Sequence, residues 1–124
     1  MINIEQLKEI PRAGIMIGSH SMTHPNLQLV ISDLELFENE IAGSKKEPES
    51  LLDTKVKCFA FPNGMYSEKS IDIAQKAGYN YLLLINDKIA EINLSSEIMK
   101  FDRILIYANK HIKNMYKLYR KNIF

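Results

Sequence analysis

The chain has 124 residues, of which 46% are hydrophobic and 25% are charged, and its 16 basic and 15 acidic side chains leave a net charge of +1. This composition is that of one ordinary globular domain, and it excludes a disordered, collagen-like or disulfide-built protein. The near-neutral balance supplies no general positive field for phosphates or lipid head groups, so neither nucleic acid nor a membrane is an expected partner.

The first part of the chain predicts a helix, a strand and a loop. Apolar residues recur at helical spacing from Ile4 and stop at Pro11. The apolar run of residues 14–18 is bounded by glycines, which is typical of a buried parallel strand. Residues 19–27 are mostly polar and predict a loop.

A second helix is predicted from a capping box at residues 32–35. The helix should start at Asp33. The side chains that it should turn inward are Leu34, Phe37 and Ile41. Its end is left open, because Gly43 could stop it and Pro48 could either kink it or begin a further helix through residue 52.

The middle of the chain predicts a strand, a turn, a helix and a second strand. Residues 55–61 alternate polar and apolar side chains and end at the turn signal of residues 62–64. Ser67 should cap a helix that ends at Gly78. The inward face of this helix should carry Ile71, Ala74 and Ala77. A strand over residues 79–85 follows.

The last part of the chain predicts a short strand and an amphipathic helix. Residues 86–100 are ambiguous, with a short helix possible after Ser95, and residues 103–107 predict a strand. Asn109 should cap a last helix with one apolar and one basic face. Such a helix could bind an anionic partner, although a solvated outer face is the commoner explanation. The alternation of strands and helices predicts a parallel sheet whose chemistry lies at its carboxyl edge.

Two short segments follow the predicted strands at that edge. His20 and His24 come after the first strand, and residues 61–64 come after the next one. Pro25 disfavours a helical conformation for His24, so we expect a structured loop. Neutral imidazoles are common ligands of zinc and other divalent metals, and a catalytic site uses about three protein ligands. Alternatively, the two rings could simply satisfy backbone groups of the loop.

The sequence around these segments resembles a known family. The elements that carry the resemblance are GIMIGSHSMTHPNL, the SDLE capping box, the Glu40-Ile41 pair and FAFPNG. They resemble the core of polysaccharide deacetylases of the NodB-homology type, carbohydrate esterase family four, over about residues 7–81. The resemblance implies an α/β fold, an incomplete (β/α) barrel of the seven-stranded deacetylase type with mostly parallel strands and outer helices. Residues 1–124 would then form a partial domain that lacks the first strands of the barrel.

The resemblance also implies a site. In this family a divalent metal, usually zinc, is held by two histidines and an aspartate, and it activates the water that attacks the acetamide of an N-acetylated sugar. His20 and His24 match the metal histidines. Pro62 and Asn63 match the catalytic loop, where the Asn63 backbone N–H would stabilise the oxyanion. The substrate groove would be lined by Phe61, Gly64 and Tyr66.

The hydroxyl and amide side chains near the histidines have a different expected role. Ser21 and Thr23 are expected to fix the loop through their hydroxyl groups. Asn26 is expected to tie the loop together in an Asx-type turn. None of the three is an expected catalytic residue.

The sequence departs from the family pattern at several positions. The family's aspartate pair, one metal ligand and one general base, precedes the histidine element, and nothing before Gly14 corresponds to it. Asp33 and Asp53 do not replace it by position, and Ala60 stands where an arginine is frequent. His111 is interpreted as a surface or packing residue. We therefore expect a site without its third protein ligand and a weak or inactive deacetylase when this chain acts alone.

Two further expectations concern partners and location. A strand at residues 15–17 would be exposed along one sheet edge, which predicts a homo-oligomer. The alternative to an enzyme is an inactive carbohydrate-binding or self-associating scaffold module of the same fold. The first 14 residues lack the apolar stretch of a signal peptide, although relatives are often exported, so the location stays unknown. Cys58 has no possible internal disulfide partner and should pack as a small hydrophobe.

Overall fold

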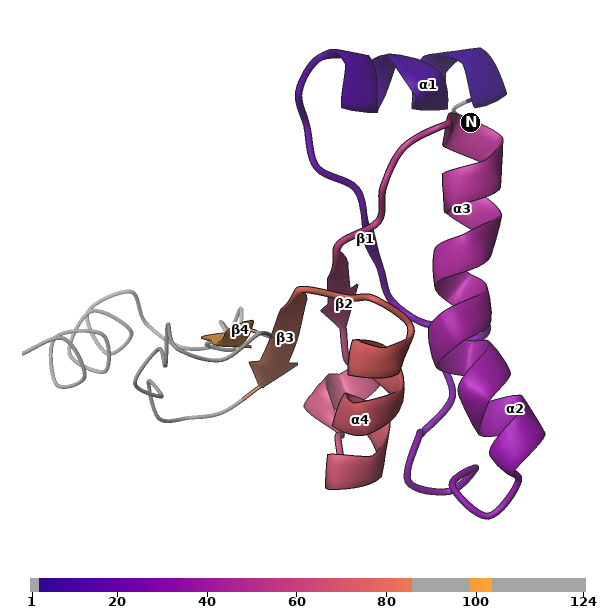
Figure 1. Ribbon diagram of the computed structural model, residues 1–124, viewed down its shortest axis with the longest axis vertical. Coiled ribbons are helices and arrows are strands. Elements are labelled where there is room, and N and C mark those ends of the chain that lie inside the picture. Colours follow the sequence, from indigo (N-terminus) through magenta and orange to yellow (C-terminus); the bar gives the residue numbers. More distant parts are fainter. Residues whose placement is uncertain (1–2, 86–98, 104–124) are drawn as a thin grey trace, which may run out of the picture.

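The computed structural model describes residues 3–85 and 99–103, which form a parallel sheet with helices packed on it (Figure 1). The elements are α1 (Ile4–Arg12), β1 (Gly18–Ser19), α2 (Leu34–Glu38), η1 (Asn39–Gly43), α3 (Ser44–Leu52), β2 (Cys58–Ala60), η2 (Pro62–Gly64), α4 (Glu68–Lys76), β3 (Tyr81–Ile85) and β4 (Met99–Arg103). Within these ranges, no helix has the length and apolar character needed to cross a bilayer.

The sheet has the order β1-β2-β3-β4, and each neighbouring pair is parallel. Parallel strands need crossover connections, and α2, η1 and α3 supply the one between β1 and β2. The α4 helix supplies the next crossover, between β2 and β3. The predicted β-α-β alternation is therefore confirmed for these strands. All of them present their carboxyl ends at one edge, where the loops after β1 and β2 lie.

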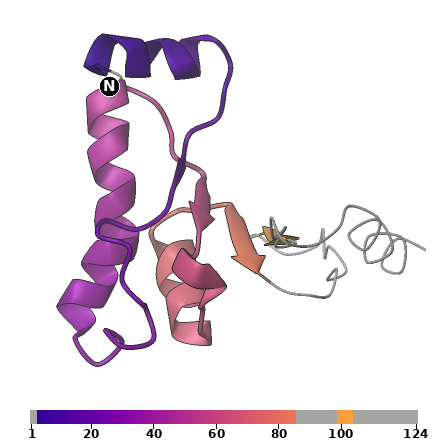
Figure 2. The same cartoon turned by 180° about the vertical axis from the view of Figure 1, so that it is seen from behind.

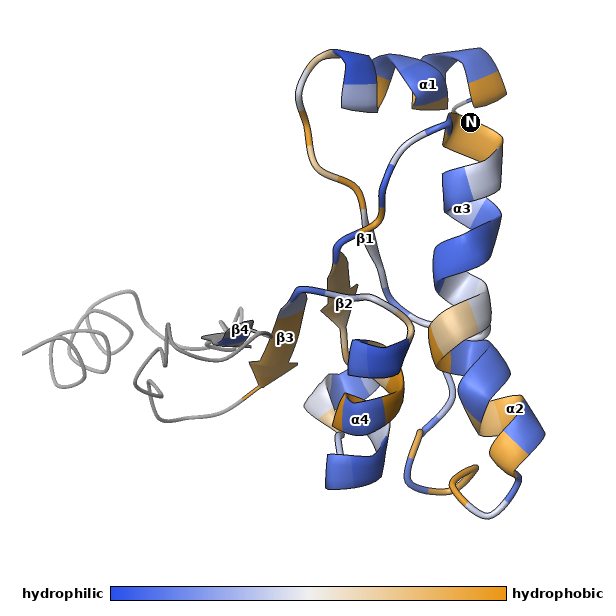
Figure 3. Cartoon of the chain, in the orientation of Figure 1, coloured by the Kyte–Doolittle hydropathy of each residue, from blue (hydrophilic) through white to orange (hydrophobic). Residues whose placement is uncertain are grey.

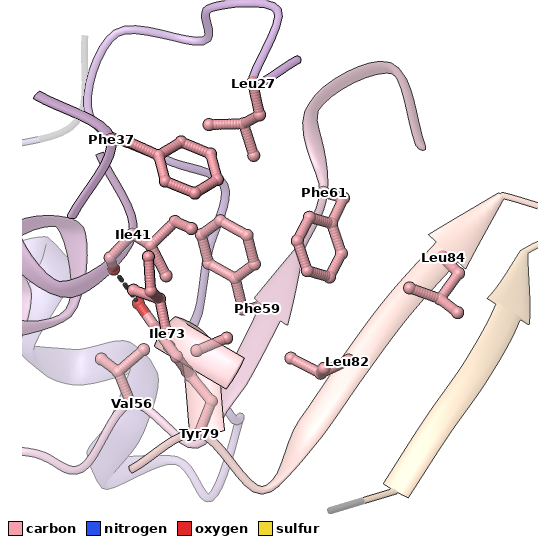
Figure 4. Packing of buried hydrophobic residues seen from close by; sticks show 11 residues of the cluster. Leu27, Phe37, Ile41, Val56, Phe59, Phe61, Ile73, Tyr79, Leu82 and Leu84 are labelled. Carbon is pink, nitrogen blue, oxygen red and sulfur yellow. Dashed lines mark hydrogen bonds between the residues drawn. The ribbon is translucent and has the colours of Figure 1, made fainter. Parts of the chain in front are cut away.

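The hydrophobic core lies between one face of the sheet and the helices (Figure 4). Burial alternates along the strands, so Phe59 in β2 and Leu82 and Leu84 in β3 are buried while their neighbours are half-buried. Helix residues Phe37 and Ile41 meet these side chains from the other side. The helices therefore cover one face of the sheet and leave the other less covered, as in a barrel whose wall is incomplete.

The predicted strand at residues 14–18 is wrong in both extent and burial. Only Gly18–Ser19 form β1, and Ile15 and Met16 are 59% and 62% exposed. Figure 3 shows this stretch as a hydrophobic connection that leads out of α1. A continuous apolar run predicts burial on both faces, but within the described residues only β2 pairs with β1, in a register of two residue pairs.

Helix α1 lies at the end of α3 that is remote from α2, as both views show (Figures 1 and 2). Asn3 is its N-cap and forms a reciprocal capping box with Gln6. The spacing predicted that the helix would stop at Pro11, but Pro11 lies within its last turn. None of the residues of α1 is buried, so this helix adds little to the core.

The long helical segment begins one residue later than predicted. Asp33 is the N-cap and accepts a hydrogen bond from the Leu36 N–H at 3.1 Å, so α2 starts at Leu34. Phe37 and Ile41 are buried as expected. The inward placement of Leu34 is wrong, because as the first residue of the helix it is 49% exposed.

The end of this segment resolves the open alternatives. Gly43 does not stop it, since η1, a π-helical stretch, leads directly into α3. Pro48 lies inside α3, which continues to Leu52. Asp53 ends the helix in the left-handed conformation with φ of 47°.

The remaining elements lie near their predicted places. Ser67 caps α4 in a capping box, and Gly78 follows the helix with φ of 87°, as predicted. The predicted face of α4 missed Ile73, which is buried. The strand predicted at residues 103–107 begins earlier than expected, because β4 starts at Met99 and pairs with all of β3, while residues 104–107 lie outside the described residues. The predicted helix after Asn109 and the ambiguous residues 86–98 lie outside the described residues.

Candidate functional site

Of the two segments predicted at the carboxyl edge of the sheet, the first contacts the end of the strand that leads into the second. His20 directly follows β1, and its Nδ1 lies 2.7 Å from the carbonyl oxygen of Ala60, the last residue of β2. Because the two strands are parallel neighbours, their ends meet at the same edge. The His20 side chain is exposed there, next to the start of the Phe61–Gly64 turn.

The rings of His20 and His24 lie side by side. Their centroids are 4.8 Å apart, and the ring planes meet at 71°. A carbonyl oxygen only accepts hydrogen bonds, so His20 Nδ1 is the donor in this contact. In the neutral ring, the Nε2 atom then keeps the lone pair that a metal ion needs. A backbone carbonyl that orients a histidine through the other ring nitrogen is a frequent feature of metal sites.

The loop that carries the histidines has the predicted irregular shape. Ser21 and His24 have φ of 69° and 59°, in the left-handed region that excludes a helix. Ser21 Oγ accepts the His24 N–H at 3.1 Å, and Asn26 Oδ1 accepts the Gln28 N–H at 3.0 Å. The loop-fixing roles predicted for Ser21 and Asn26 are therefore confirmed.

Glu40, which contributed to the family resemblance, was assigned no role from the sequence. It lies in η1, and only 1% of its surface is exposed. Its Oε2 accepts the N–H groups of Met22 and Thr23, both at 2.9 Å, and its Oε1 accepts the Thr23 hydroxyl at 2.6 Å. The available signal was a carboxylate on the same helical stripe as Phe37 and Ile41, where an apolar residue is expected.

A second polar network holds the residue that precedes His20. The buried Ser19 hydroxyl donates to Ser44 Oγ at 2.7 Å, and Ser44 Oγ donates to the Ile41 carbonyl at 2.9 Å. Tyr79 donates its hydroxyl to the same carbonyl at 3.0 Å. Burial raises the pKa of the Tyr79 phenol, so it stays protonated and remains a donor at neutral pH.

The predicted turn after β2 is formed by its own backbone. Pro62 and Gly64 are buried, while Asn63 is exposed with φ of 53°. The N–H groups of Gly64 and Met65 bond back to residues 61 and 62, at 3.0 Å each. Within the part of the chain that the structure describes, no acceptor engages the Asn63 N–H. The turn thus presents one backbone donor at the same sheet edge as the histidines.

The three residues expected to line a groove differ in exposure. Phe61 is fully buried and packs edge to face on Phe59, and Gly64 is buried beneath the turn. Tyr66 is 38% exposed, with its ring centroid 5.9 Å from that of Phe61. A ligand at this edge would therefore meet Asn63 and Tyr66 directly, supported by the two buried residues.

His20 and His24 are two possible metal ligands, and the described part of the chain brings no third ligand to them. Among residues 3–85 and 99–103, no group of three or more His, Cys, Asp or Glu side chains is arranged to hold a metal. Asp33 serves as the α2 cap and Asp53 ends α3, so neither replaces the expected aspartate. The donor chemistry of the two imidazoles suits a divalent cation, but it supplies two of the about three protein ligands of a catalytic site.

Known proteins share both sequence and fold with this chain. The sequence profile of the family described as polysaccharide deacetylase matches residues 2–82. YxkH of Bacillus subtilis strain 168, whose name places it among the polysaccharide deacetylases, is 32% identical over 75 residues, which are 60% of this chain and 26% of YxkH. The chain thus spans about a quarter of that relative.

Solved structures show the same fold at low identity. The deacetylase PplD of Streptococcus pyogenes, in complex with acetate, superposes with a TM-score of 0.71 at 21% identity, over 94% of this chain and 50% of PplD. The alpha-amylase AmyC of Thermotoga maritima reaches 0.69 at 16% identity, over 81% of this chain and 22% of AmyC. The fold is therefore an incomplete barrel of the deacetylase type, and its likeness alone does not specify a reaction. With most of its length matched by the family profile, the chain belongs to the polysaccharide deacetylase family.

Proposed function

We propose that this chain carries part of a metal-dependent deacetylase site that hydrolyses acetamide groups of N-acetylated sugars. The observation that carries the proposal is the pairing of the His20 and His24 rings, with His20 bound to the last residue of β2, from which the turn at residues 62–64 follows. Family membership supports the class of reaction, because the names of YxkH and PplD are those of deacetylases.

Each part of the edge has a chemical role in this proposal. His20 and His24 hold a divalent cation, for which zinc is the leading candidate because imidazole nitrogen is among its usual ligands. When bound, such a metal polarises the amide carbonyl and lowers the pKa of a water molecule toward neutrality. The exposed Asn63 N–H donates a hydrogen bond to the oxyanion, with Pro62 fixing the turn. Tyr66 offers an exposed ring to the sugar, backed by Phe61 and Gly64.

The proposal includes a weak reaction by this chain alone. The described residues contain no group of three His, Cys, Asp or Glu side chains that could hold a metal, and the Glu40 carboxylate bound to the histidine loop is buried and engaged by hydrogen bonds. Loss of a positioned general base costs about two to four orders of magnitude in rate. A second chain or a further segment that supplied a carboxylate would restore that rate.

Metal binding is the first test. The purified chain is stripped with chelator, titrated with zinc by calorimetry, and analysed for bound metal. We expect about one zinc per chain, with binding lost in His20→Ala and in His24→Ala. His111→Ala serves as the matched control and should bind like the wild type, since the chain has three histidines. Equal binding by all four proteins would overturn the assignment of the metal ligands.

Chemistry is the second test. Acetate release from N-acetylglucosamine oligomers is measured for the zinc-loaded chain against His20→Ala. Release above the variant supports the hydrolase. Full zinc occupancy without any acetate release would instead favour a binding module.

An inactive carbohydrate-binding or self-associating scaffold is the second candidate function. The exposed Tyr66 ring favours sugar binding, and the exposed Ile15 and Met16 beside β1 favour contact with a second copy of this chain. Light scattering after size-exclusion chromatography tests whether the chain associates with a second copy of itself. A dimer that Met16→Lys converts to monomers supports it, and a wild-type monomer at micromolar concentration contradicts it.

A further inference from the structure

The carboxylate of Glu40 is buried without a cation beside it. Only 1% of the residue is exposed, and within the described ranges no lysine, arginine or histidine forms an ion pair with it. A buried carboxylate is strongly disfavoured unless hydrogen bonds replace its lost water. Among the described residues, the hydrogen-bond donors to Glu40 belong to Met22 and Thr23. The buried Glu40 carboxyl group and the histidine loop therefore depend on each other.

The loop needs such support because its backbone is strained. Ser21 and His24 both have positive φ, a region that residues with a side chain seldom adopt. Met22 and Thr23 lie between them, and their N–H groups converge on one oxygen atom of Glu40, at 2.9 Å each. The carboxylate thus fixes the middle of the segment whose two ends carry His20 and His24.

The same helical segment also holds the residue before His20. Ser44, one turn beyond Glu40, accepts the hydrogen bond of the buried Ser19 hydroxyl at 2.7 Å. Side chains of one helical segment therefore hold the chain on both sides of His20, Ser44 through Ser19 and Glu40 through Met22. The His20 ring itself lies 2.7 Å from the Ala60 carbonyl oxygen. Glu40 lies in the π-helical stretch η1, a rare form that is frequent at functional sites, and Ser44 directly follows it as the first residue of α3.

We propose that Glu40 is a positioning residue, which holds the loop of residues 21–24 so that the His20 and His24 imidazoles are preorganised for one divalent cation. This inference rests on the proposed function, because it takes the two histidines as metal ligands. Groups that orient metal ligands without touching the metal change affinity by about 10- to 100-fold when they are removed. Glu40 acts through the loop backbone and therefore belongs to this class.

The central experiment compares Glu40→Ala with Glu40→Gln in zinc titrations of the metal-free chain. Glu40→Ala leaves the Met22 and Thr23 N–H groups without an acceptor, and we expect zinc affinity to fall about 10- to 100-fold. The glutamine carbonyl can still accept both N–H groups, while its NH2 group faces the Thr23 hydroxyl oxygen. Glu40→Gln should therefore recover much of the affinity, within about 10-fold of the wild type.

Glu49 provides a matched control on the same helical segment. Its Oε1 accepts the Val56 N–H at 2.9 Å and the Lys45 ammonium at 2.6 Å, away from the histidine loop. Glu49→Ala should lower the free energy of unfolding but leave zinc affinity within about twofold of the wild type. A folded Glu40→Ala protein with affinity equally close to the wild type would overturn the proposal.

A milder variant covers the case in which Glu40→Ala does not fold. Thr23 is exposed, and Thr23→Val removes only its hydroxyl donor to Glu40 Oε1. We expect about a 3- to 10-fold loss of zinc affinity, corresponding to one hydrogen bond. Unchanged affinity in a folded Thr23→Val protein would contradict the proposal.

Amide hydrogen exchange separates this inference from the proposed function. In the metal-free chain, the Met22 and Thr23 amides should exchange faster in Glu40→Ala and Thr23→Val than in the wild type and in Glu49→Ala. If the wild type binds no zinc, the proposed metal site fails, yet the exchange rates still decide whether Glu40 holds the loop. Equal exchange at both amides in all four proteins would refute the positioning role.

Discussion

The loop after β1 is held by side chains from a distant helix, whereas the turn after β2 is held by its own backbone. Glu40 holds the loop after β1 through Met22 and Thr23. Ser44 holds the residue before this loop, Ser19. The turn after β2 closes through the N–H groups of Gly64 and Met65, each of which bonds to the carbonyl three residues back. Both segments lie at one sheet edge, but only the backbone turn is encoded by adjacent residues.

The difference predicts two kinds of sensitivity. A turn fixed by local backbone geometry should respond most to a change in that backbone, and the response should appear as lost stability. A loop fixed by a remote carboxylate and hydroxyl should respond to substitutions far along the sequence, with a change in the position of its histidines. Variants in the two regions can therefore test the comparison separately.

The largest expected effect is that of Gly64→Ala in the turn. Gly64 has φ of 67°, and a Cβ atom there would overlap the Ile85 side chain in β3. Left-handed strain and overpacking together should lower the free energy of unfolding by about 3 kcal/mol. Urea denaturation of the full chain measures this loss.

Gly14→Ala separates the two causes. Gly14 also has a positive φ of 79°, but a Cβ atom there would meet nothing within 4 Å. Only the backbone strain remains, so we expect a loss of about 1 kcal/mol. Equal losses in the two variants would show that the contact with Ile85 contributes nothing.

The next effect is that of Ser44→Ala, which removes the anchor in front of His20. The Ser44 hydroxyl is buried, donates to the Ile41 carbonyl and accepts from Ser19, so its loss leaves the buried Ser19 hydroxyl without this acceptor. We expect the free energy of unfolding to fall by about 1–2 kcal/mol. Ser50→Ala, at an exposed position of α3, is the control and should stay within about 0.5 kcal/mol of the wild type.

Local signals in the sequence were sufficient for much of this fold. The cap at Ser67, the left-handed Gly78 and the turn at residues 62–64 all follow from short-range backbone chemistry, and the structure confirms each. The alternation of strands and helices also gave the parallel order of the sheet. The loop form of the histidine segment followed from Pro25 alone.

Features that depend on tertiary neighbours were missed. The apolar run predicted that Ile15 and Met16 would be buried, but both are exposed. Burial would require a neighbouring strand on the other side, and the run itself does not show whether one is present. The role of Glu40 depends on its hydrogen bonds to Met22 and Thr23, which lie 18 and 17 positions earlier in the chain. No local pattern reveals that these residues meet. The histidines were found because both belong to one short motif, whereas their support comes from another element.

The smallest expected effect concerns the acid dependence of stability through Glu49. The hydrogen bond from Lys45, followed by that from the Val56 N–H, lowers the pKa of this carboxyl from its ordinary value of 4.5. A carboxyl whose pKa is lowered in the folded state stabilises the fold above the unfolded pKa. That contribution should disappear as the pH falls below 4.5 and through the lowered pKa.

Urea unfolding of the wild type and of Glu49→Gln between about pH 7 and pH 3 measures this contribution. The variant should be less stable at neutral pH, and the difference between the two proteins should shrink as the solution becomes acidic. Glu47→Gln, at an exposed position of the same helix, controls for the loss of one negative charge. If the stability difference between the wild type and Glu49→Gln grew on acidification, its pH dependence would have the opposite sign to the one expected. Glu49 would then not hold the chain entering β2 in the way proposed for Glu40 and the loop leaving β1.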